Sequence, residues 1–247
     1  MRAPMVAANW KMNGSGAICR EFLEHLSVDG LVDVVLFPPF LYTSRLSKGF
    51  EERSISVGVQ NVFHARSGAY TGEIGAEMAV DAGAMYALVG HSERRNLFGE
   101  SDEVVADKFV ACQRAGLTPV LCVGESFEER EDGRAESVVR RQMDAVIKAG
   151  GVKGFANAVI AYEPVWAIGT GETARPDQAQ SMHAFIRAVL TQFDAAIATN
   201  IKVLYGGSVK SNNARELFAE QDIDGGLVGG ASLEFMEFEK ICRAASH

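Results

Sequence analysis

One segment, AYEPVWAIGTG at residues 161–171, joins the end of a strand, a carboxylate and a glycine-ended loop. The apolar run before it, 158–162, is typical of a parallel strand buried on both faces, and Pro164 ends that strand. Glu163 then lies where removal from water raises the basicity of a carboxylate. Residues 165–170 supply apolar cover for a lid. We expect Glu163 to act as a general base; the alternative is a strand-end glutamate paired with a lysine and followed by an ordinary loop.

A histidine follows another apolar run. His91 begins the sequence HSERR directly after residues 88–90, which predicts that it lies at the first turn of a helix. The positive end of the helix dipole disfavours imidazolium there and favours a neutral imidazole that donates a hydrogen bond. The alternative is a histidine with a purely structural role.

A lysine and two glycine pairs offer positive charge and backbone donors. Lys11, in NWKMNG, follows the first apolar run, and its ammonium would stabilise an oxyanion or a phosphate, although a surface lysine is the default reading. The sequences YGGS at 205–208 and VGGAS at 228–232 end two later apolar runs. They resemble the phosphate site that barrels build from backbone N–H groups and the N-terminus of a short helix.

The elements that must position these residues alternate along the chain. Eight short apolar runs predict strands, and the segments between them have helical spacing, as in 104–112 and 138–147. Strict alternation implies right-handed crossovers and a parallel sheet, and this many units in 247 residues favour a closed (β/α)₈ barrel over an open sheet. No linker divides the chain, so we expect a single domain over 1–247. The predicted strands cover 5–8, 34–37, 56–59, 86–89, 119–123, 159–162, 202–205 and 226–228.

A closed barrel would gather the reactive residues at one mouth, because all its parallel strands end on the same face. Asn9 and Lys11 follow the first predicted strand, His91 the fourth and Glu163 the sixth, and the glycine pairs follow the last two. A base, a neutral acid, a cation and a phosphate cradle together suit one reaction. That reaction moves a proton between adjacent carbons of a small phosphorylated carbonyl compound through an enediolate.

Composition and charge exclude several classes of partner. Hydrophobic residues make up 47% of the chain and charged residues 23%, which is ordinary for a soluble globular protein. A net charge of −8 without a basic cluster argues against nucleic acid. No apolar stretch approaches the roughly 18 residues that span a bilayer, so we expect no membrane association. The four scattered cysteines are read as reduced thiols of a cytoplasmic protein.

No cofactor and no metal are implied by the sequence. The run GTGETA at 169–174 imitates a dinucleotide fingerprint, but it follows a tryptophan-bearing loop late in the chain rather than a first strand. The chain contains no P-loop pattern, and its histidines and cysteines lack the spacing of metal ligands.

Taken in order, the motifs resemble those of the triosephosphate isomerase family over the whole chain. The resemblance implies a single-domain (β/α)₈ TIM barrel that interconverts D-glyceraldehyde 3-phosphate and dihydroxyacetone phosphate, in glycolysis and gluconeogenesis, without a cofactor. The matching motifs are NWKMNG at 9–14, GAYTGE at 68–73, GHSERR at 90–95, AYEPVWAIGTG at 161–171, YGGSV at 205–209 and VGGASL at 228–233.

The resemblance also implies roles for individual residues. Glu163 would be the catalytic base, His91 the electrophile that polarises the carbonyl, and Lys11 the charge that stabilises the developing oxyanion. Asn9 would line the site beside Lys11, with Glu93 a second carboxylate near it. The backbone phosphate cradle would comprise Gly169, Ser208, Gly229 and Gly230, with 164–171 as the closing lid.

Members of the family are dimers, so the resemblance implies a homodimer. The loop 61–73 resembles the one that inserts into the neighbouring subunit, where Thr71 would reach the partner's site. Two positions depart from the family's pattern. Glu172 replaces a lysine at the C-terminal hinge of the lid, and Gly226 replaces a larger strand residue, which leaves lid motion and local packing open.

Two alternatives remain. Another phosphosugar isomerase, or an aldolase, could use the same barrel, but a Schiff-base aldolase needs a buried lysine at a strand end, whereas Lys202 begins its strand. A catalytically silent binding protein that kept the phosphate pocket would lack the base, the histidine or the lysine, and all three are present.

Overall fold

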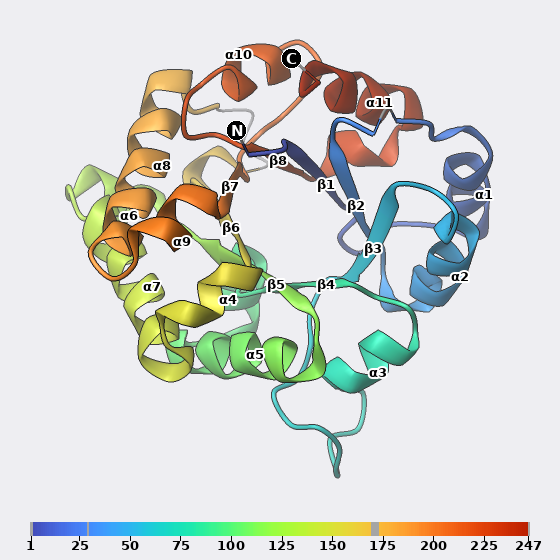
Figure 1. Cartoon of the computed structure of the whole chain (residues 1–247), viewed down its shortest axis with the longest axis horizontal. Helices are drawn as coiled ribbons and strands as arrows, with labels where there is room; N and C mark the ends of the chain where they lie inside the picture. The colour runs from blue at the N-terminus through green and yellow to red at the C-terminus, as the bar shows by residue number, and fades with distance from the viewer. Residues whose placement is uncertain (1, 29, 169–172, 247) are drawn as a thin grey trace.

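Eight parallel strands form a closed barrel at the centre of the structure, a computed structural model that describes residues 2–28, 30–168 and 173–246. Each strand pairs with the next along the chain, and the pairing of β1 with β8 closes the ring (Figure 1). The predicted (β/α)₈ barrel is confirmed, and each predicted strand agrees with an observed one to within one residue at either end. The strands are β1 Met5–Asn9, β2 Asp33–Phe37, β3 Ile55–Val59, β4 Tyr86–Val89, β5 Thr118–Val123, β6 Val159–Tyr162, β7 Lys202–Tyr205 and β8 Gly225–Val228.

Helices surround the barrel and cover its outer surface (Figure 1). Their ends follow local rules, as in α5, where the Ser101 hydroxyl accepts a hydrogen bond from the Val104 N–H at 3.3 Å and Gly116 ends the helix at φ 85°. The α-helices are α1 Gly16–His25, α2 Phe40–Phe50, α3 Ala76–Asp81, α4 Ser92–Phe98, α5 Asp102–Ala115, α6 Phe127–Glu131, α7 Ala135–Gly150, α8 Pro176–Thr191, α9 Ala195–Asn200, α10 Ala214–Phe218 and α11 Phe235–Ala244. Short 3₁₀ helices are η1 Val152–Asn157, η2 Val165–Ala167 and η3 Gly230–Leu233.

Alternation along the strands divides the apolar residues between two cores. In β1, Met5 and Ala7 belong to the small cluster inside the barrel, whereas Val6 and Ala8 belong to the larger cluster that includes the helices. In β6 the inner positions are Val159 and Ala161. The strands are therefore buried on both faces, which is why they read as continuous apolar runs.

The same alternation explains how two polar residues reach the inside of the barrel mouth. Asn9 is two residues beyond Ala7, and Glu163 is two residues beyond Ala161, so both continue the inward-facing set at the carboxyl ends of their strands. Asn9 is 4% exposed and Glu163 2% exposed. Strand alternation thus directs a carboxylate and an amide to the buried rim of the barrel.

Gly226 departs from the family's pattern, and the structure shows what takes the space of the missing side chain. A Cβ at this position would lie 3.1 Å from Cζ of Phe218. The Phe218 ring, from α10, packs against the strand where a larger strand residue would otherwise reach. The other departure, Glu172, lies outside the described residues.

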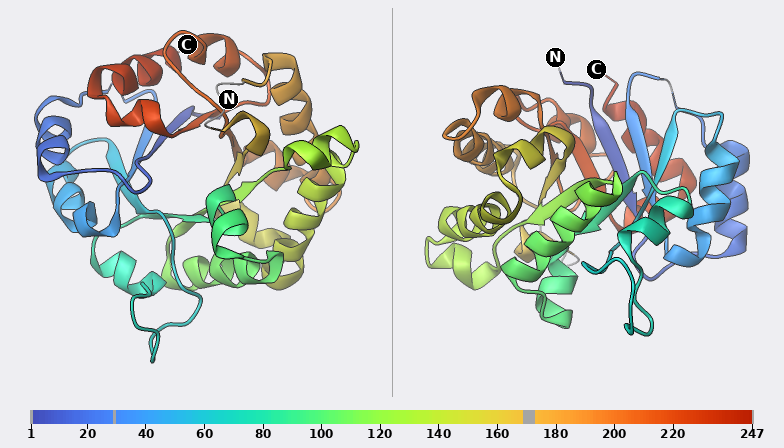
Figure 2. Two further views of the ribbon diagram at one scale, coloured as in Figure 1. Left: turned by 180° about the vertical axis from the view of Figure 1, so that it is seen from behind. Right: turned by 60° about the horizontal axis from the view of Figure 1, so that its bottom comes forward.

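Two further segments lie away from the mouth. Lys202, at the start of β7, forms an ion pair with Asp33 at the start of β2, on the opposite face of the barrel from the strand ends. The loop between β3 and α3 projects away from the body of the molecule (Figures 1 and 2). Among the helices of the described residues, none combines the length and apolar character needed to cross a membrane.

Candidate active site

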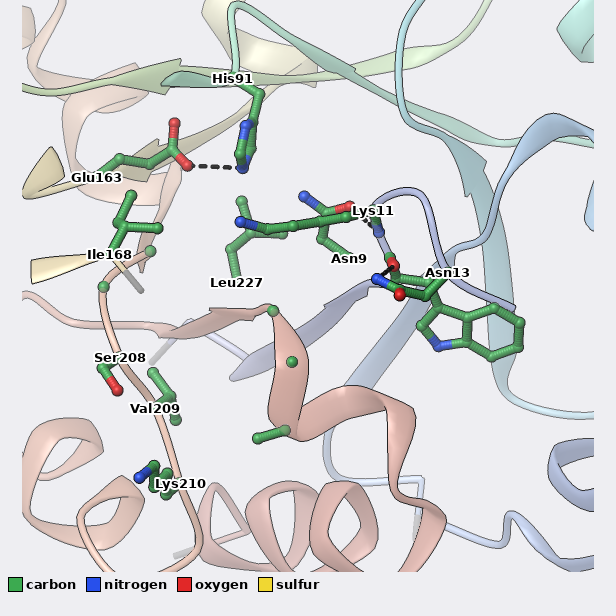
Figure 3. A pocket seen from close by; sticks show the side chains of 16 residues that line it. Asn9, Lys11, Asn13, His91, Glu163, Ile168, Ser208, Val209, Lys210 and Leu227 are labelled. Atoms are coloured by element: carbon green, nitrogen blue, oxygen red, sulfur yellow. Dashed lines mark hydrogen bonds and ion pairs between the residues drawn. The ribbon is translucent and has the colours of Figure 1, made fainter. Parts of the chain in front are cut away.

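A cavity of about 270 Å³ opens at the carboxyl ends of the strands (Figure 3). Residues from β1, β4, β6, β7 and β8 or the loops after them meet around it, although they are far apart in the sequence. Of the residues singled out from the sequence, its lining includes Asn9, Lys11, His91, Glu163, Ser208, Gly229 and Gly230. Ile168 of the expected lid lines it as well. Side chains without an expected role also line it, among them Asn13, Val209, Lys210 and Leu227.

The Glu163 carboxylate is held by two donors. Its Oε2 accepts a hydrogen bond from the Ser92 N–H at 2.8 Å, and its Oε1 lies 2.9 Å from Nε2 of His91. Burial raises the pKa of Glu163, but the His91 ring and the Ser92 N–H favour the carboxylate more strongly, and the pKa lies below its ordinary value. The expectation of raised basicity is therefore wrong for this arrangement, because the sequence did not reveal the two donors.

His91 lies immediately before the first residue of α4, as predicted. The Glu93 N–H donates to Nδ1 of His91 at 3.3 Å, which leaves Nε2 facing Glu163. Burial lowers the pKa of His91, but the carboxylates of Glu163 and Glu93 outweigh burial, so the pKa lies above its ordinary value. The direction is opposite to the one expected from the helix dipole alone. The neutral Nε2–H tautomer nevertheless fits the ring, because only this tautomer accepts at Nδ1 while donating from Nε2.

Lys11 is the one residue other than glycine with a positive φ, 52°, in the described part of the chain. Its N–H donates to Oδ1 of Asn9 at 3.0 Å, and its carbonyl accepts from Nε2 of Gln60 at 2.8 Å. Left-handed backbone of this kind costs on the order of 1–3 kcal/mol and persists only where the surroundings hold it. The ammonium lies 2.5 Å from Oε1 of Glu93, which fixes the side chain inside the mouth.

Backbone groups of two glycine-containing loops line the far side of the cavity. Gly229 and Gly230 follow β8, and η3 begins at Gly230. The Ser232 hydroxyl donates to the Gly229 carbonyl at 2.7 Å and steadies this turn. Ser208 follows β7 and faces the same space. Gly169, the fourth residue of the expected cradle, lies outside the described residues, as does the end of the expected lid.

A buried carboxylate that the sequence reading missed holds the first part of the lid. Oε1 of Glu125, beyond the end of β5, accepts hydrogen bonds from the Tyr162 hydroxyl at 3.1 Å and from Nε1 of Trp166 at 3.0 Å. The Arg130 guanidinium lies 3.2 Å from the same oxygen and 4.8 Å from the centre of the Trp166 ring. Trp166 in η2 is thereby tied to α6 and to the end of β5.

Gln60, Ser92 and Glu125 share a signal that could have found them. Each lies within three residues after the end of a strand, on the face where the other site residues converge. Gln60 follows β3, Ser92 follows β4 and Glu125 follows β5. The sequence search for chemically reactive types passed over an amide, a backbone donor and a second strand-end carboxylate. A search by position after each strand would have included all three.

Close backbone packing fixes the position of Glu163. A Cβ on Gly124 would lie 1.8 Å from the carbonyl oxygen of Glu163, and a Cβ on Gly206 would lie 2.9 Å from its Cγ. Neither position has room for a side chain. The neighbouring loops after β5 and β7 therefore hold the carboxylate from both sides.

Two residues singled out from the sequence do not line the cavity. Glu93 contacts two side chains that line the cavity, Lys11 and His91, without lining it itself. Thr71 is exposed in the projecting loop, next to Tyr70, whose ring packs 4.5 Å from that of Phe63. Within the described ranges, no three His, Cys, Asp or Glu side chains gather to form a metal site.

Comparison with known proteins agrees with this geometry. A family model described as triosephosphate isomerase matches residues 4–245. A protein of Pseudomonas entomophila named triosephosphate isomerase is 55% identical over 251 residues, covering all of both chains. Proteins of the same name from Xanthomonas oryzae pv. oryzae and Pseudomonas putida are 54% and 55% identical, with all of this chain and at least 99% of theirs covered.

Proposed function

Because the chain belongs to the triosephosphate isomerase family, we propose that it interconverts D-glyceraldehyde 3-phosphate and dihydroxyacetone phosphate through an enediolate. The observation that carries the proposal is the convergence of a carboxylate, an imidazole and an ammonium from three separate strands on one cavity. These groups supply a base, a hydrogen-bond donor and a positive charge, so the reaction is proposed to need no cofactor and no metal.

Glu163 is the proposed base. It takes the proton from carbon 2 of glyceraldehyde 3-phosphate and returns a proton to carbon 1. In the structure both its oxygens are engaged by Ser92 and His91, which lowers its pKa. When the carboxylate turns from these donors toward a substrate, their stabilising effect is lost while burial remains. Its basicity then rises at the point of use.

His91 and Lys11 are proposed to stabilise the oxygen on which negative charge develops. The Nε2–H of a neutral His91 donates to the carbonyl oxygen once Glu163 has turned away from it. Lys11 adds a fixed positive charge, and Asn9 holds the strained turn that directs it. Preorganised donors of this kind cost no rearrangement at the moment of reaction. Glu93 is proposed to hold the ammonium in place through its 2.5 Å contact.

The phosphate of the substrate is proposed to bind the backbone and the hydroxyl of Ser208, Gly229, Gly230 and Gly169. Residues 164–171 are proposed to close over it. The contacts of Trp166 with Glu125 anchor the first turn of this segment, which supports a hinge near Pro164. Closure would exclude water from the enediolate and prevent loss of the phosphate.

A homodimer is proposed, with the loop 61–73 of each subunit reaching the other's site through Thr71. The projection of this loop from the body of the molecule supports the proposed dimer, as does its exposed Tyr70 (Figure 1).

Large apolar side chains are exposed after the end of β1 and in α4, including Met12 at 97%, Leu97 at 76% and Phe98 at 67%. We propose that the partner subunit covers some of these side chains, because removing large apolar side chains from water favours association. We also propose that the protein is a cytoplasmic enzyme of glycolysis and gluconeogenesis, formed by one domain over 1–247.

A coupled assay tests the proposal. Glyceraldehyde 3-phosphate is supplied, and dihydroxyacetone phosphate is followed by its reduction with a separate NADH-dependent dehydrogenase. We expect rapid conversion by the wild-type protein and a loss of several orders of magnitude in Glu163→Gln, which keeps the shape of the side chain. Absence of conversion by the folded wild-type protein would overturn the proposed activity.

A further inference from the structure

Lys210 occupies the outer edge of the cavity, on the loop between β7 and α10. Ser208, Val209 and Lys210 follow one another along a segment that leads away from Glu163 and His91 (Figure 3). The Lys210 side chain is exposed, whereas Val209 before it is buried. Lys210 therefore lies between the interior of the site and the solvent from which a substrate arrives.

The backbone that carries Lys210 is firmly held. Its N–H donates to Oδ1 of Asn213 at 2.8 Å, and Nδ2 of Asn213 donates to the Ser208 carbonyl at 3.1 Å. The next residue, Ser211, donates from its N–H and hydroxyl to the two oxygens of Glu237 in α11, at 2.7 and 2.9 Å. The backbone of Lys210 is thus fixed at the rim, and its exposed side chain extends from there.

The other charged side chains that line the cavity are balanced by partners. Lys11 contacts Glu93, and Glu163 contacts His91. None of the ion pairs found among the described residues involves Lys210. Glu237, whose pKa is lowered mainly by the Ser211 N–H and to a lesser extent by Lys240 and Lys210, interacts with Lys210 only beyond ion-pair distance. Among the charged side chains of the described lining residues, Lys210 is therefore the one that forms no ion pair.

The proposed substrate is a phosphate ester with about two negative charges, and the chain has a net charge of −8. At long range such a protein repels its substrate, so capture depends on the local field at the mouth. We propose that Lys210 attracts the phosphate of the approaching substrate and raises its rate of association, without contacting the reacting atoms. This inference rests on the proposed function and adds a residue that acts before the chemical steps.

The test compares Lys210→Met, Lys210→Glu and Lys210→Arg with Lys48→Met. Lys48 is an exposed lysine in the last turn of α2, away from the mouth, so its replacement makes the same change in net charge. At low ionic strength we expect kcat/KM to fall roughly 3- to 10-fold in Lys210→Met and further in Lys210→Glu, since one unit charge acts on a dianion nearby. We expect kcat to stay unchanged, Lys210→Arg to match the wild type, and Lys48→Met to show no loss.

Salt dependence and an uncharged substrate separate this role from a structural one. The difference between wild type and Lys210→Met should shrink as salt rises toward 1 M, where screening reaches about 3 Å. Deuterium exchange into glyceraldehyde, which lacks the phosphate, should proceed equally in both proteins. A loss that persists in salt, or that extends to glyceraldehyde, would overturn the inference. Unchanged kcat/KM in an active Lys210→Glu would overturn it too, while leaving the proposed isomerase activity standing.

Discussion

Oε1 of Glu163 lies 2.9 Å from Nε2 of His91, although β5 separates the strands that carry them. The proposed base and the proposed electrophile therefore contact each other in the absence of substrate. A substrate must therefore break the contact between Glu163 and His91 and become the new partner of both side chains. The energy of the contact opposes that exchange, and we expect binding of the phosphate at the proposed subsite to supply the energy that drives it.

Shortening the base should slow the chemical step. Glu163→Asp keeps the carboxylate but withdraws it by about 1 Å, and misplacement of that size can lower the rate on the order of 10²-fold. We expect kcat to fall by about this factor with little change in KM, as measured in the coupled assay. Glu131→Asp, at an exposed position of α6, is the matched control and should retain full activity. An undiminished kcat in Glu163→Asp would remove Glu163 as the base.

The His91 ring should titrate above the ordinary range of histidine, near pH 6.5, in the substrate-free protein. Burial lowers the pKa of His91, but the carboxylates of Glu163 and Glu93 raise it by more than burial lowers it. In Glu163→Gln the larger of these carboxylate effects is absent, and we expect the pKa to fall. NMR of protein with ¹⁵N-labelled histidine measures both curves. A His91 midpoint that is the same in the two proteins would show that the contact with Glu163 does not control its protonation.

The same contact should make stability depend on pH. Because the folded-state pKa of His91 lies above its unfolded value, its contribution is fully present below about pH 6.5 and is lost as pH rises through the raised pKa. Glu163, whose pKa is lowered, contributes above its unfolded value near 4.5, and this part is lost as pH falls. Urea unfolding at fixed protein concentration should show the wild type losing stability relative to Glu163→Gln between pH 6 and pH 9. A constant difference would contradict this account.

Adding a methyl group to Gly124 should displace the base. The new Cβ would lie 1.8 Å from the Glu163 carbonyl oxygen, so β5 and β6 must separate locally. We expect Gly124→Ala to lose activity by more than about 10²-fold, the size associated with misplacement by 1 Å, and to unfold at lower temperature. Gly30→Ala is the control, because no atom lies within 4 Å of its Cβ position. Wild-type activity in Gly124→Ala would mean that the backbone of Glu163 adjusts without moving the carboxylate.

Activity should depend on assembly. Residues 66–73 of the loop 61–73 are exposed in the single chain, so without a partner subunit we expect them to lose order, at a cost in entropy. We expect the double variant Tyr70→Glu, Thr71→Lys to form weaker dimers and to have much lower turnover. Analytical ultracentrifugation measures dimer formation and the coupled assay measures turnover, at the same protein concentrations. If the variant sediments as a monomer and still has wild-type turnover, dimerisation is not required for activity.

The strands and the mouth of the barrel could be predicted from sequence because their signals are local. Runs such as 159–162 are apolar on both faces, and the alternation that places Glu163 inside follows from strand geometry alone. The turn at Lys11 could not be predicted in this way. Its positive φ depends on Gln60, which arrives from the end of β3.

The pKa directions of Glu163 and His91 could not be predicted from the sequence for a related reason. Burial of Glu163 and the helix dipole at His91 can be inferred from neighbours in the chain, and each was expected to act alone. The 2.9 Å contact joins residues from β6 and the end of β4, and it reverses both expected directions of pKa. Pairwise effects between distant segments decide such values, and only the folded arrangement reveals them.

Isomerisation in D₂O, followed by NMR of the product, tests the central claim most directly. If Glu163 carries the proton between carbons, the carboxylic acid exchanges with solvent during some turnovers. Deuterium then appears on carbon 1 of dihydroxyacetone phosphate made by the wild-type protein, and Glu163→Gln yields neither product nor deuterated substrate. Product that forms rapidly without any deuterium in both the wild type and Glu163→Gln would indicate direct hydride transfer, and deuterium incorporation that survives in Glu163→Gln would assign the proton to another base. Either result would contradict the account.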